Sequence, residues 1–400
     1  MHIRALILYF YLSVGLSLSA CHQDMQISPS QSDTFIKLYG GFYTENAYAA
    51  EQTADDGYIC LGSTNSSGNG GMDLYLFKTD KAGNKEWEKT IGGTSDDEGK
   101  ALQVLDDGSF ICLGDYTGED GFTDLYLIKI SNTGEVIWTK TIGQTGRSEK
   151  AFDLKITATG DLLLIGNSLT NTGTTDMYLV KTDLAGNIKW QKDYGLTALQ
   201  DDISSVIETS EGNLVWCGSE FRQRTGHTSS DMRVILTSPE GDVIWDKNFG
   251  KDNTDKGSDI LLNGSGFVAL GSTLNTQESE ADIYLISLFQ GGTVRWEQAV
   301  QKPKSSEEAK SIYATTDGGY IITGSTTVSG TGNQDILLLK VDNTGKEVWS
   351  KSFGGKHPDT GNKVRQTSDG GYIIFGTIYF ETNPMLCLIK TNAQGELDIK

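Results

Sequence analysis

The sequence predicts an all-β fold assembled from seven copies of one unit of 52 or 53 residues. Two series of residues define the unit. A glycine ends a short apolar run at seven evenly spaced places, and a tryptophan lies four residues after a turn glycine at six places. Glycine is abundant, with 48 residues, whereas proline is scarce, with 5. Such a composition is typical of many short strands joined by tight turns.

The glycine series follows one predicted strand in each unit. Runs such as YICLG, LLLIG and YIITG are rich in Ile, Leu and Tyr and are bounded by Gly and Asp, which predicts strands. The seven glycines are Gly62, Gly114, Gly166, Gly218, Gly271, Gly324 and Gly376.

The next two predicted strands form a hairpin that recurs almost unchanged. DLYLFKTDKAGNKEWEKTIGG at 73–93 and DILLLKVDNTGKEVWSKSFGG at 335–355 share an opening aspartate, a turn glycine and a tryptophan. The turn is expected to be type I, with glycine in the left-handed position. The tryptophans are Trp87, Trp138, Trp190, Trp245, Trp296 and Trp349. An indole buries about 150–250 Å², so we predict that each one fills the gap between neighbouring units.

Four antiparallel strands in about 50 residues predict a propeller blade. We therefore predict a single seven-bladed β-propeller over residues 34–400. The tryptophan series lacks a seventh copy, but FIKLYGG at 35–41 matches WEKTIGG at 87–93 with Phe35 in the tryptophan place, and Ile399 takes that place at the other end. The N-terminal strand is thus expected to pair with the C-terminal blade and close the ring, since an open ring would leave a bare edge.

The pattern D-x-Y-L-x-K-x-D-x-x-G-x-x-x-W-x-K-x-x-G-G resembles the repeats of exported bacterial β-propeller proteins over residues 34–400. Its G-x-x-x-W part resembles the tryptophan-docking motif of quinoproteins and of the propeller lipoprotein of outer-membrane assembly. The resemblance implies the fold and leaves the function open, because propellers host unrelated activities. The adjacent cysteines that lie under the quinoprotein cofactor are absent from this sequence, so we expect no cofactor.

The N-terminus predicts export. Residues 1–20 have a positive start and an apolar stretch, as a signal peptide does. LSAC at 18–21 resembles the lipobox of bacterial lipoproteins, which implies that Cys21 carries the lipid (palmitate among its acyl chains) and that the polar segment 21–33 is a flexible tether. By the same resemblance, His22 and Gln23 favour the outer membrane of a Gram-negative cell. A plain secretory signal with an incidental cysteine is the alternative.

The net charge of the chain excludes some classes of partner. A net charge of −20 argues against nucleic acid, whose phosphates require a basic face, and against docking on anionic lipid. We expect a monomer whose partners are an envelope protein, a peptide or a glycan.

An acidic residue opens the first strand of each unit and predicts a ring of carboxylates. A cation site is one interpretation. A structural clamp, in which each carboxylate accepts backbone N–H groups, is the preferred one, because architecture repeats with the symmetry whereas function breaks it. This acidic ring comprises Glu45, Asp97, Glu149, Asp201, Asp255, Glu307 and Asp359, with Thr254 at the strict spacing in the fifth unit.

Residues that break the repeat are therefore the better ligand-binding candidates. The second-to-third strand connection of the fourth unit, SEFRQRTGHTSSD at 219–231, is predicted to be the longest loop, and its arginines could recognise a carboxylate or a sugar acid. Solvated loops that bind nothing are the alternative. The candidates are Phe221, Arg222, Arg224 and His227, with Tyr116 and Phe122 in the second unit and Tyr379 and Phe380 in the seventh.

Catalytic motifs are missing from the sequence. It has no H-x-x-x-H or C-x-x-C pair for zinc, no G-x-S-x-G elbow and no P-loop. The acid pair Asp201–Asp202 could serve a glycosidase, as could Asp96–Asp97 and Glu307–Glu308, but these pairs belong to the repeating ring. We expect no metal site, and we expect Cys60, Cys112, Cys217 and Cys387 to be buried thiols.

The leading hypothesis is a lipid-anchored envelope propeller that acts as a non-catalytic binding or scaffold module. An envelope enzyme, either a polysaccharide lyase or a glycosidase, and an outer-membrane assembly scaffold are the alternatives.

Overall fold

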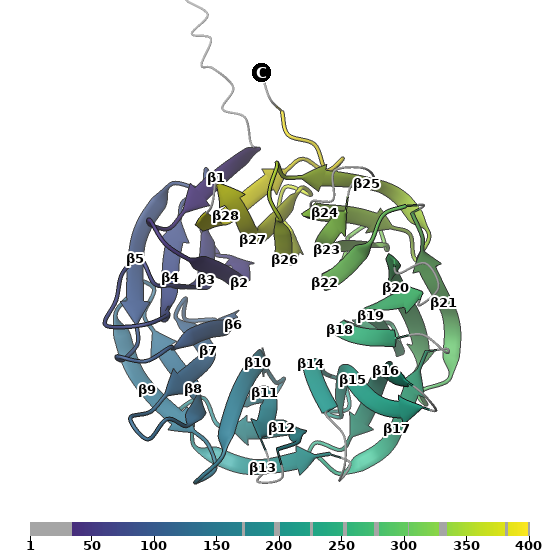
Figure 1. Ribbon diagram of the computed structural model, residues 1–400, viewed down its shortest axis with the longest axis horizontal. Helices are drawn as coiled ribbons and strands as arrows, with labels where there is room; N and C mark the ends of the chain where they lie inside the picture. Colours follow the sequence, from purple (N-terminus) through teal and green to yellow (C-terminus); the bar gives the residue numbers. More distant parts are fainter. Residues whose placement is uncertain are drawn as a thin grey trace, which may run out of the picture. The chain divides into compact units, whose positions relative to one another are not determined.

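The computed structural model describes residues 34–169, 173–195, 201–224, 227–250, 254–275, 280–302, 304–327, 334–380 and 383–398. These residues belong to one compact unit, Asp33–Lys400. They form seven four-stranded antiparallel sheets arranged in a ring around a central channel (Figure 1). The predicted seven-bladed β-propeller is therefore confirmed.

The innermost strand of each blade lines the channel, and a second strand pairs with it. The innermost strands are β2 (Glu45–Gln52), β6 (Glu98–Val104), β10 (Ser148–Ile156), β14 (Asp201–Glu208), β18 (Thr254–Asn263), β22 (Glu307–Ala314) and β26 (Thr360–Gln366). The second strands are β3 (Tyr58–Thr64), β7 (Phe110–Thr117), β11 (Leu162–Leu169), β15 (Leu214–Arg224), β19 (Gly266–Asn275), β23 (Tyr320–Thr327) and β27 (Tyr372–Phe380).

The third and outer strands complete each blade. The third strands are β4 (Asp73–Thr79), β8 (Thr123–Ile130), β12 (Thr175–Thr182), β16 (His227–Thr237), β20 (Glu280–Phe289), β24 (Gln334–Val341) and β28 (Asn383–Thr391). The outer strands are β5 (Lys85–Ile91), β9 (Val136–Ile142), β13 (Ile188–Tyr194), β17 (Val243–Phe249), β21 (Val294–Val300), β25 (Glu347–Phe353) and β1 (Phe35–Tyr39).

The core lies between the blades. Second and third strands are buried on both faces, as in β3 and β4, where every residue is buried. Both faces of these strands pack against neighbouring sheets, which explains their unbroken apolar runs. Each hydrophobic cluster accordingly draws on two successive blades, as when Leu61 and Leu76 pack with Cys112 and Ile128.

The tryptophans link each blade to the next, as predicted. Trp87 packs against Phe110 of the following blade, and its Nε1–H donates to the carbonyl oxygen of Asn132 over 3.2 Å. Its ring covers the turn glycine Gly134, which has a φ of +86°; a Cβ there would lie 2.9 Å from the indole. The glycine thus provides a left-handed turn and room for the neighbouring ring.

The ring closes through β1, which pairs with β28 of the last blade. Phe35 lies opposite Lys390 in that sheet, and its ring meets Tyr58 of the first blade at 6.2 Å between centroids. It also covers the turn glycine Gly83, as the tryptophans do elsewhere. The predicted closure is therefore confirmed; Ile399 lies outside the described residues.

One prediction about the fourth blade is wrong. Residues 219–231 are mostly strand, because β15 and β16 continue in register to the pair Arg224↔His227. Backbone hydrogen bonds between two antiparallel strands form whatever the side chains are. Polar residues can therefore extend a hairpin without the apolar alternation by which a strand is recognised in a sequence. Cys60, Cys112, Cys217 and Cys387 are buried and free, as expected.

Candidate functional site in the central channel

Every innermost strand carries a β-bulge at the same place, where one residue has no partner on the second strand. A bulge bends the strand and redirects a side chain. The unpaired residues, which we call the bulge ring, all line the channel: Tyr48, Lys100, Phe152, Ser204, Ser258, Lys310 and Asn362. The seven residues that follow them, the post-bulge ring, are Ala49, Ala101, Asp153, Ser205, Asp259, Ser311 and Lys363.

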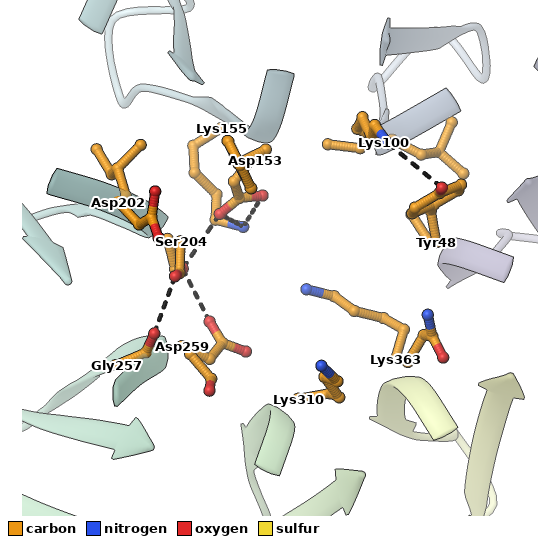
Figure 2. Close-up of a pocket in the computed structure, with 18 of the residues that line it drawn as sticks. Tyr48, Lys100, Asp153, Lys155, Asp202, Ser204, Gly257, Asp259, Lys310 and Lys363 are labelled. Atoms are coloured by element: carbon orange, nitrogen blue, oxygen red, sulfur yellow. Dashed lines mark hydrogen bonds and ion pairs between the residues drawn. The ribbon is translucent and has the colours of Figure 1, made fainter. Parts of the chain in front are cut away.

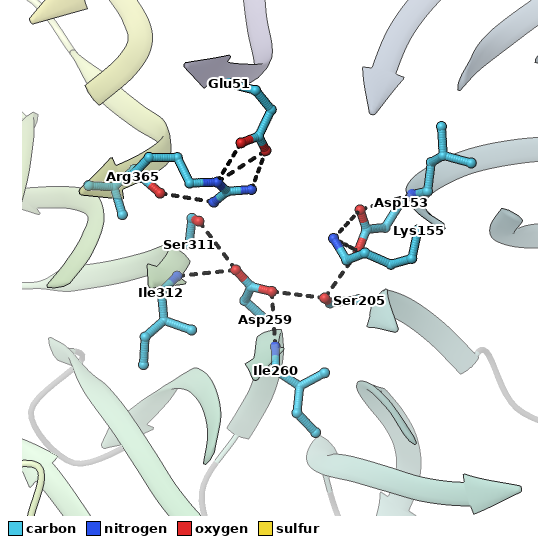
Figure 3. A network of polar contacts seen from close by, with 11 residues as sticks. Glu51, Asp153, Lys155, Ser205, Asp259, Ile260, Ser311, Ile312 and Arg365 are labelled. Carbon is cyan, nitrogen blue, oxygen red and sulfur yellow. Dashed lines mark hydrogen bonds and ion pairs between the residues drawn. The ribbon is translucent and has the colours of Figure 1, made fainter. Parts of the chain in front are cut away.

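Four members of the post-bulge ring form a hydrogen-bonded arc across blades three to six (Figure 3). The Ser205 hydroxyl lies 3.1 Å from Asp153 Oδ2 and 2.8 Å from Asp259 Oδ1. Ser311 donates to Asp259 Oδ2 over 3.2 Å, and the backbone N–H of Ile312 donates to the same oxygen over 3.1 Å. These carboxylates are therefore held in place by protein donors.

Further charged pairs surround the arc. The Arg365 guanidinium binds both oxygens of Glu51, with Nε 2.9 Å from Oε2, and this pair joins the last blade to the first (Figure 3). Lys155 Nζ lies 3.0 Å from Asp153 Oδ2. In the second blade, Lys100 pairs with Glu98 and lies 4.3 Å from the ring centroid of Tyr48.

These rings enclose a cavity of about 450 Å³, to which all seven innermost strands contribute (Figure 2). Its lining includes six basic residues, Lys100, Lys155, Lys256, Lys310, Lys363 and Arg365, and five acidic ones, Glu51, Asp153, Asp202, Asp259 and Glu308. The lining is thus balanced or slightly positive, although the chain as a whole has a net charge of −20.

Burial and neighbouring charges shift the pKa values of these groups. Burial would raise the pKa of the Asp153 carboxyl, but Lys155 and Lys363 outweigh burial and lower it. Burial lowers the pKa of Lys363, and Arg365 adds to that effect. Burial raises the pKa of Asp202, although a 2.9 Å hydrogen bond from Asn167 lowers it in part. Burial also raises the pKa of Tyr48 to about 12.

The acidic ring lies at the loop end of the innermost strands, and its carboxylates are buried. Asp97 accepts hydrogen bonds from the backbone N–H groups of Gly93 and Thr117, and Asp359 accepts from those of Gly355 and Tyr379. Glu45 accepts from Gly41 N–H. Glu149 accepts hydrogen bonds from Gln144 N–H and the Ser168 hydroxyl, and Glu307 accepts them from the hydroxyls of Ser305 and Thr326. Asp201 forms an ion pair with Arg233. Asp255 is the buried carboxylate of the fifth blade.

The predicted ligand-binding residues do not gather in one place. Phe221 is half-buried and lines the central cavity. Tyr116 stacks on Tyr126 with 5.1 Å between centroids, in a separate surface hollow. Phe122, Tyr379 and Phe380 are exposed on loop-side strand ends. The side chains of Arg222, Arg224 and His227 lie outside the described ones, as does Cys21.

The sequence prediction missed the channel lysines. A usable signal existed, because five of the seven innermost strands carry a lysine in a strongly acidic chain: Lys100 in β6, Lys150 and Lys155 in β10, Lys256 in β18, Lys310 in β22 and Lys363 in β26. Within the described part of the chain, no three His, Cys, Asp or Glu side chains are close enough to hold a metal ion. The same residues contain no helix that could cross a membrane.

Comparisons with known proteins establish the fold and no family. No family model matches the chain. The regulatory protein FlaEY of Caulobacter vibrioides is 22% identical over 232 residues, which are 49% of this chain and 24% of that protein. This chain therefore aligns with about a quarter of that relative's length.

Two solved structures illustrate the likeness. The BP39L lectin of Burkholderia pseudomallei has a TM-score of 0.56 and 8% identity, over 90% of this chain and 98% of the lectin. The GH93 α-L-arabinofuranosidase of Fusarium graminearum, in complex with arabinobiose, has a TM-score of 0.50 and 10% identity, over 90% of this chain and 99% of that enzyme. At such low identity the likeness shows the shared propeller architecture alone.

Proposed function

We propose that this protein is a non-catalytic binding module of the cell envelope, held by a lipid on Cys21, that takes a glycan or a peptide into the central cavity. The observation that carries this proposal is the cavity lining, in which charged groups pair with one another. The pairs Glu51–Arg365 and Asp153–Lys155 fix their side chains before any ligand arrives. Preorganised polar groups reduce the entropy lost on binding.

The composition of the cavity fits a hydroxyl-rich or amide-rich ligand. Ser204, Ser258 and Asn362 line the cavity together with the aromatic residues Tyr48 and Phe152. Polar groups that fix orientation, combined with aromatic faces that stack, are typical of small-ligand sites.

The first described residue lies on the face of the short hairpins. Thr34 lies beside the C-terminal turn, where its hydroxyl accepts a hydrogen bond from Asp398 N–H over 2.8 Å. That end of β1 is on the face of the short hairpins, opposite the acidic ring.

Screening the full-length protein against glycan and peptide libraries tests this function. We expect binding to survive in Ser67→Trp, which alters an exposed loop, and to be lost in Ser258→Trp, which fills the cavity. The ligand should be recovered chemically unchanged. Binding that Ser258→Trp leaves intact would contradict the cavity as the site.

An envelope glycosidase is the second candidate, and Asp202 is the observation that favours it. Its raised pKa and its place in the cavity lining are what a general acid needs. If the protein is an enzyme, mass spectrometry will detect cleaved glycan, and Asp202→Asn will abolish cleavage while binding persists. If it is a binding module, Asp202→Asn and the wild type will both return intact glycan.

A further inference from the structure

Lys363 differs from three other basic residues of the cavity in having no paired carboxylate. In Figure 2 its side chain extends from β26 into the cavity, and its Nζ makes no hydrogen bond or ion pair within the described part of the chain. Lys155, Lys310 and Arg365 are paired with Asp153, Glu308 and Glu51 respectively. The ammonium of Lys363 is therefore available to a ligand.

The post-bulge ring leaves room next to this ammonium. Going round the channel from Lys363, the next two positions are Ala49 and Ala101, and the remaining four positions are occupied by the hydrogen-bonded arc from Asp153 to Ser311. Two methyl groups occupy little of the space that longer side chains take elsewhere in the ring. We therefore expect room for a ligand next to Lys363 on the side of blades one and two, where Tyr48 and Lys100 also line the cavity.

The electrostatic environment of this space favours an anion. Burial lowers the pKa of Lys363, and the charges of Arg365 and Lys155 add to this effect, whereas Asp259 and Asp153 oppose it. An anion beside the ammonium would relieve the repulsion from Arg365 and Lys155. Asp153 and Asp259 are already engaged in the arc by Ser205, Ser311 and Lys155, and neither forms an ion pair with Lys363 within the described part of the chain.

We propose that the cavity binds the oxyanion of an acidic ligand, with a carboxylate or phosphate oxygen on Lys363 Nζ and the rest of the ligand against Ala49 and Ala101. A sugar acid fits this chemistry best, since the same lining supplies hydroxyl and aromatic partners for a ring. This inference rests on the proposed function and adds the ligand class and the residue that selects it. A charge-assisted hydrogen bond in a partly dry cavity discriminates strongly against a neutral analogue.

Isothermal titration calorimetry of the full-length protein with glucuronate, glucose and inorganic phosphate tests this inference. We expect glucuronate to bind at least tenfold more tightly than glucose, the factor expected of one charge-assisted hydrogen bond. Lys363→Met should remove this preference and Lys363→Arg should restore part of it. Lys351→Met on the outer strand β25 is the matched control and should leave binding unchanged.

The outcomes separate the two proposals. Phosphate binding that Lys363→Met abolishes, without glucuronate binding, would keep the oxyanion site and overturn the sugar-acid assignment. Glucose binding as tight as glucuronate binding, unchanged in Lys363→Met, would overturn the oxyanion site and leave the glycan-binding function standing.

Thermal melting of Lys363→Met should match the wild type, because the variant removes an unpaired charge; a variant that fails to fold is replaced by Lys363→Gln. Absence of binding to all three probes by the folded wild-type protein would overturn the oxyanion site, and the library screen would then decide the function separately.

Discussion

At the scale of single residues, the repeat is maintained by contacts between an indole and a glycine of the next blade. Trp87 over Gly134 is one case, and Trp296 over Gly345 and Trp349 over Gly395 are others. Each contact depends on the turn glycine lacking a side chain. The G-x-x-x-W motif of each blade therefore contributes to two interfaces. Its glycine contacts the tryptophan of the previous blade, and its tryptophan contacts the glycine of the next blade.

The substitution Gly134→Ala tests this contact. Its φ of +86° strains any alanine, and the added Cβ would also lie 2.9 Å from the indole of Trp87. Gly318→Ala is a matched control, because Gly318 has a φ of +87°, donates to the carbonyl three residues earlier as Gly134 does, and has nothing within 4 Å of its would-be Cβ. We expect Gly134→Ala to lower the free energy of unfolding by about 1–3 kcal/mol more than the control. Equal losses in denaturant melts would mean that the indole contact contributes little.

A buried carboxyl in the second blade predicts a pH dependence. Burial raises the pKa of Asp115 to about 6, although Lys100 lies 3.7 Å away. Because the folded-state pKa is above the ordinary value of 3.8, the carboxyl favours folding below pH 4, and this contribution is lost as the pH rises through 6.

Asp115→Asn removes that titration while keeping an acceptor for Ala151 N–H; Asn167 fills the same role in the third blade. We expect the variant to gain about 1–3 kcal/mol of stability relative to the wild type between pH 4 and pH 7. Urea melts at both pH values measure this difference. Parallel pH profiles for the two proteins would contradict it.

At the scale of strands, one short element completes the ring. β1 pairs with β28, and its Phe35 covers Gly83 of the first blade. The seam between the first and last blades also contains the Glu51–Arg365 pair and a 2.7 Å hydrogen bond from Asn362 Nδ2 to the Ala47 carbonyl. These contacts join residues more than 300 positions apart in the chain.

Deleting residues 34–41 should therefore destabilise every blade and not only the last. We expect the melting temperature to fall by about 10 °C or more and the transition to broaden, because the loss removes a strand ladder and an aromatic contact. A chain that begins at Thr34 is the control and should melt as the full-length protein does. If the deletion variant melts at the same temperature as this control, β1 does not hold the ring closed.

The repeating elements were predictable from the sequence, whereas one extension of a hairpin was not. The spacing of glycines and tryptophans predicted the blades, and Phe35 predicted the closing strand, because both signals repeat with the architecture. The paired extension of β15 and β16 was not predicted, since the segment around Arg222 and Arg224 has the polar composition of a loop. Hydrogen bonding across a hairpin satisfies backbone groups whatever the side chains are.

At the scale of the whole molecule, the candidate site exists only when the ring is complete. The bulge ring and the post-bulge ring take one residue each from every innermost strand, about 52 residues apart in the chain. Lys363, Ala49 and Ala101 come from three innermost strands that are far apart in the chain, so the sequence could indicate an acidic ring and variable loops but could not bring these three residues together. The acidic ring, by contrast, recurs in each repeat and was visible from the spacing.

The whole-molecule claim is that the propeller binds its ligand inside the channel without reacting with it. A crystal structure of the full-length protein grown with a ligand from the library screen tests this claim most directly. We expect intact ligand within the cavity, in contact with Lys363 of β26 and with β2 and β6. Ligand found only on the outer surfaces of the blades, or cleaved within the cavity, would contradict it.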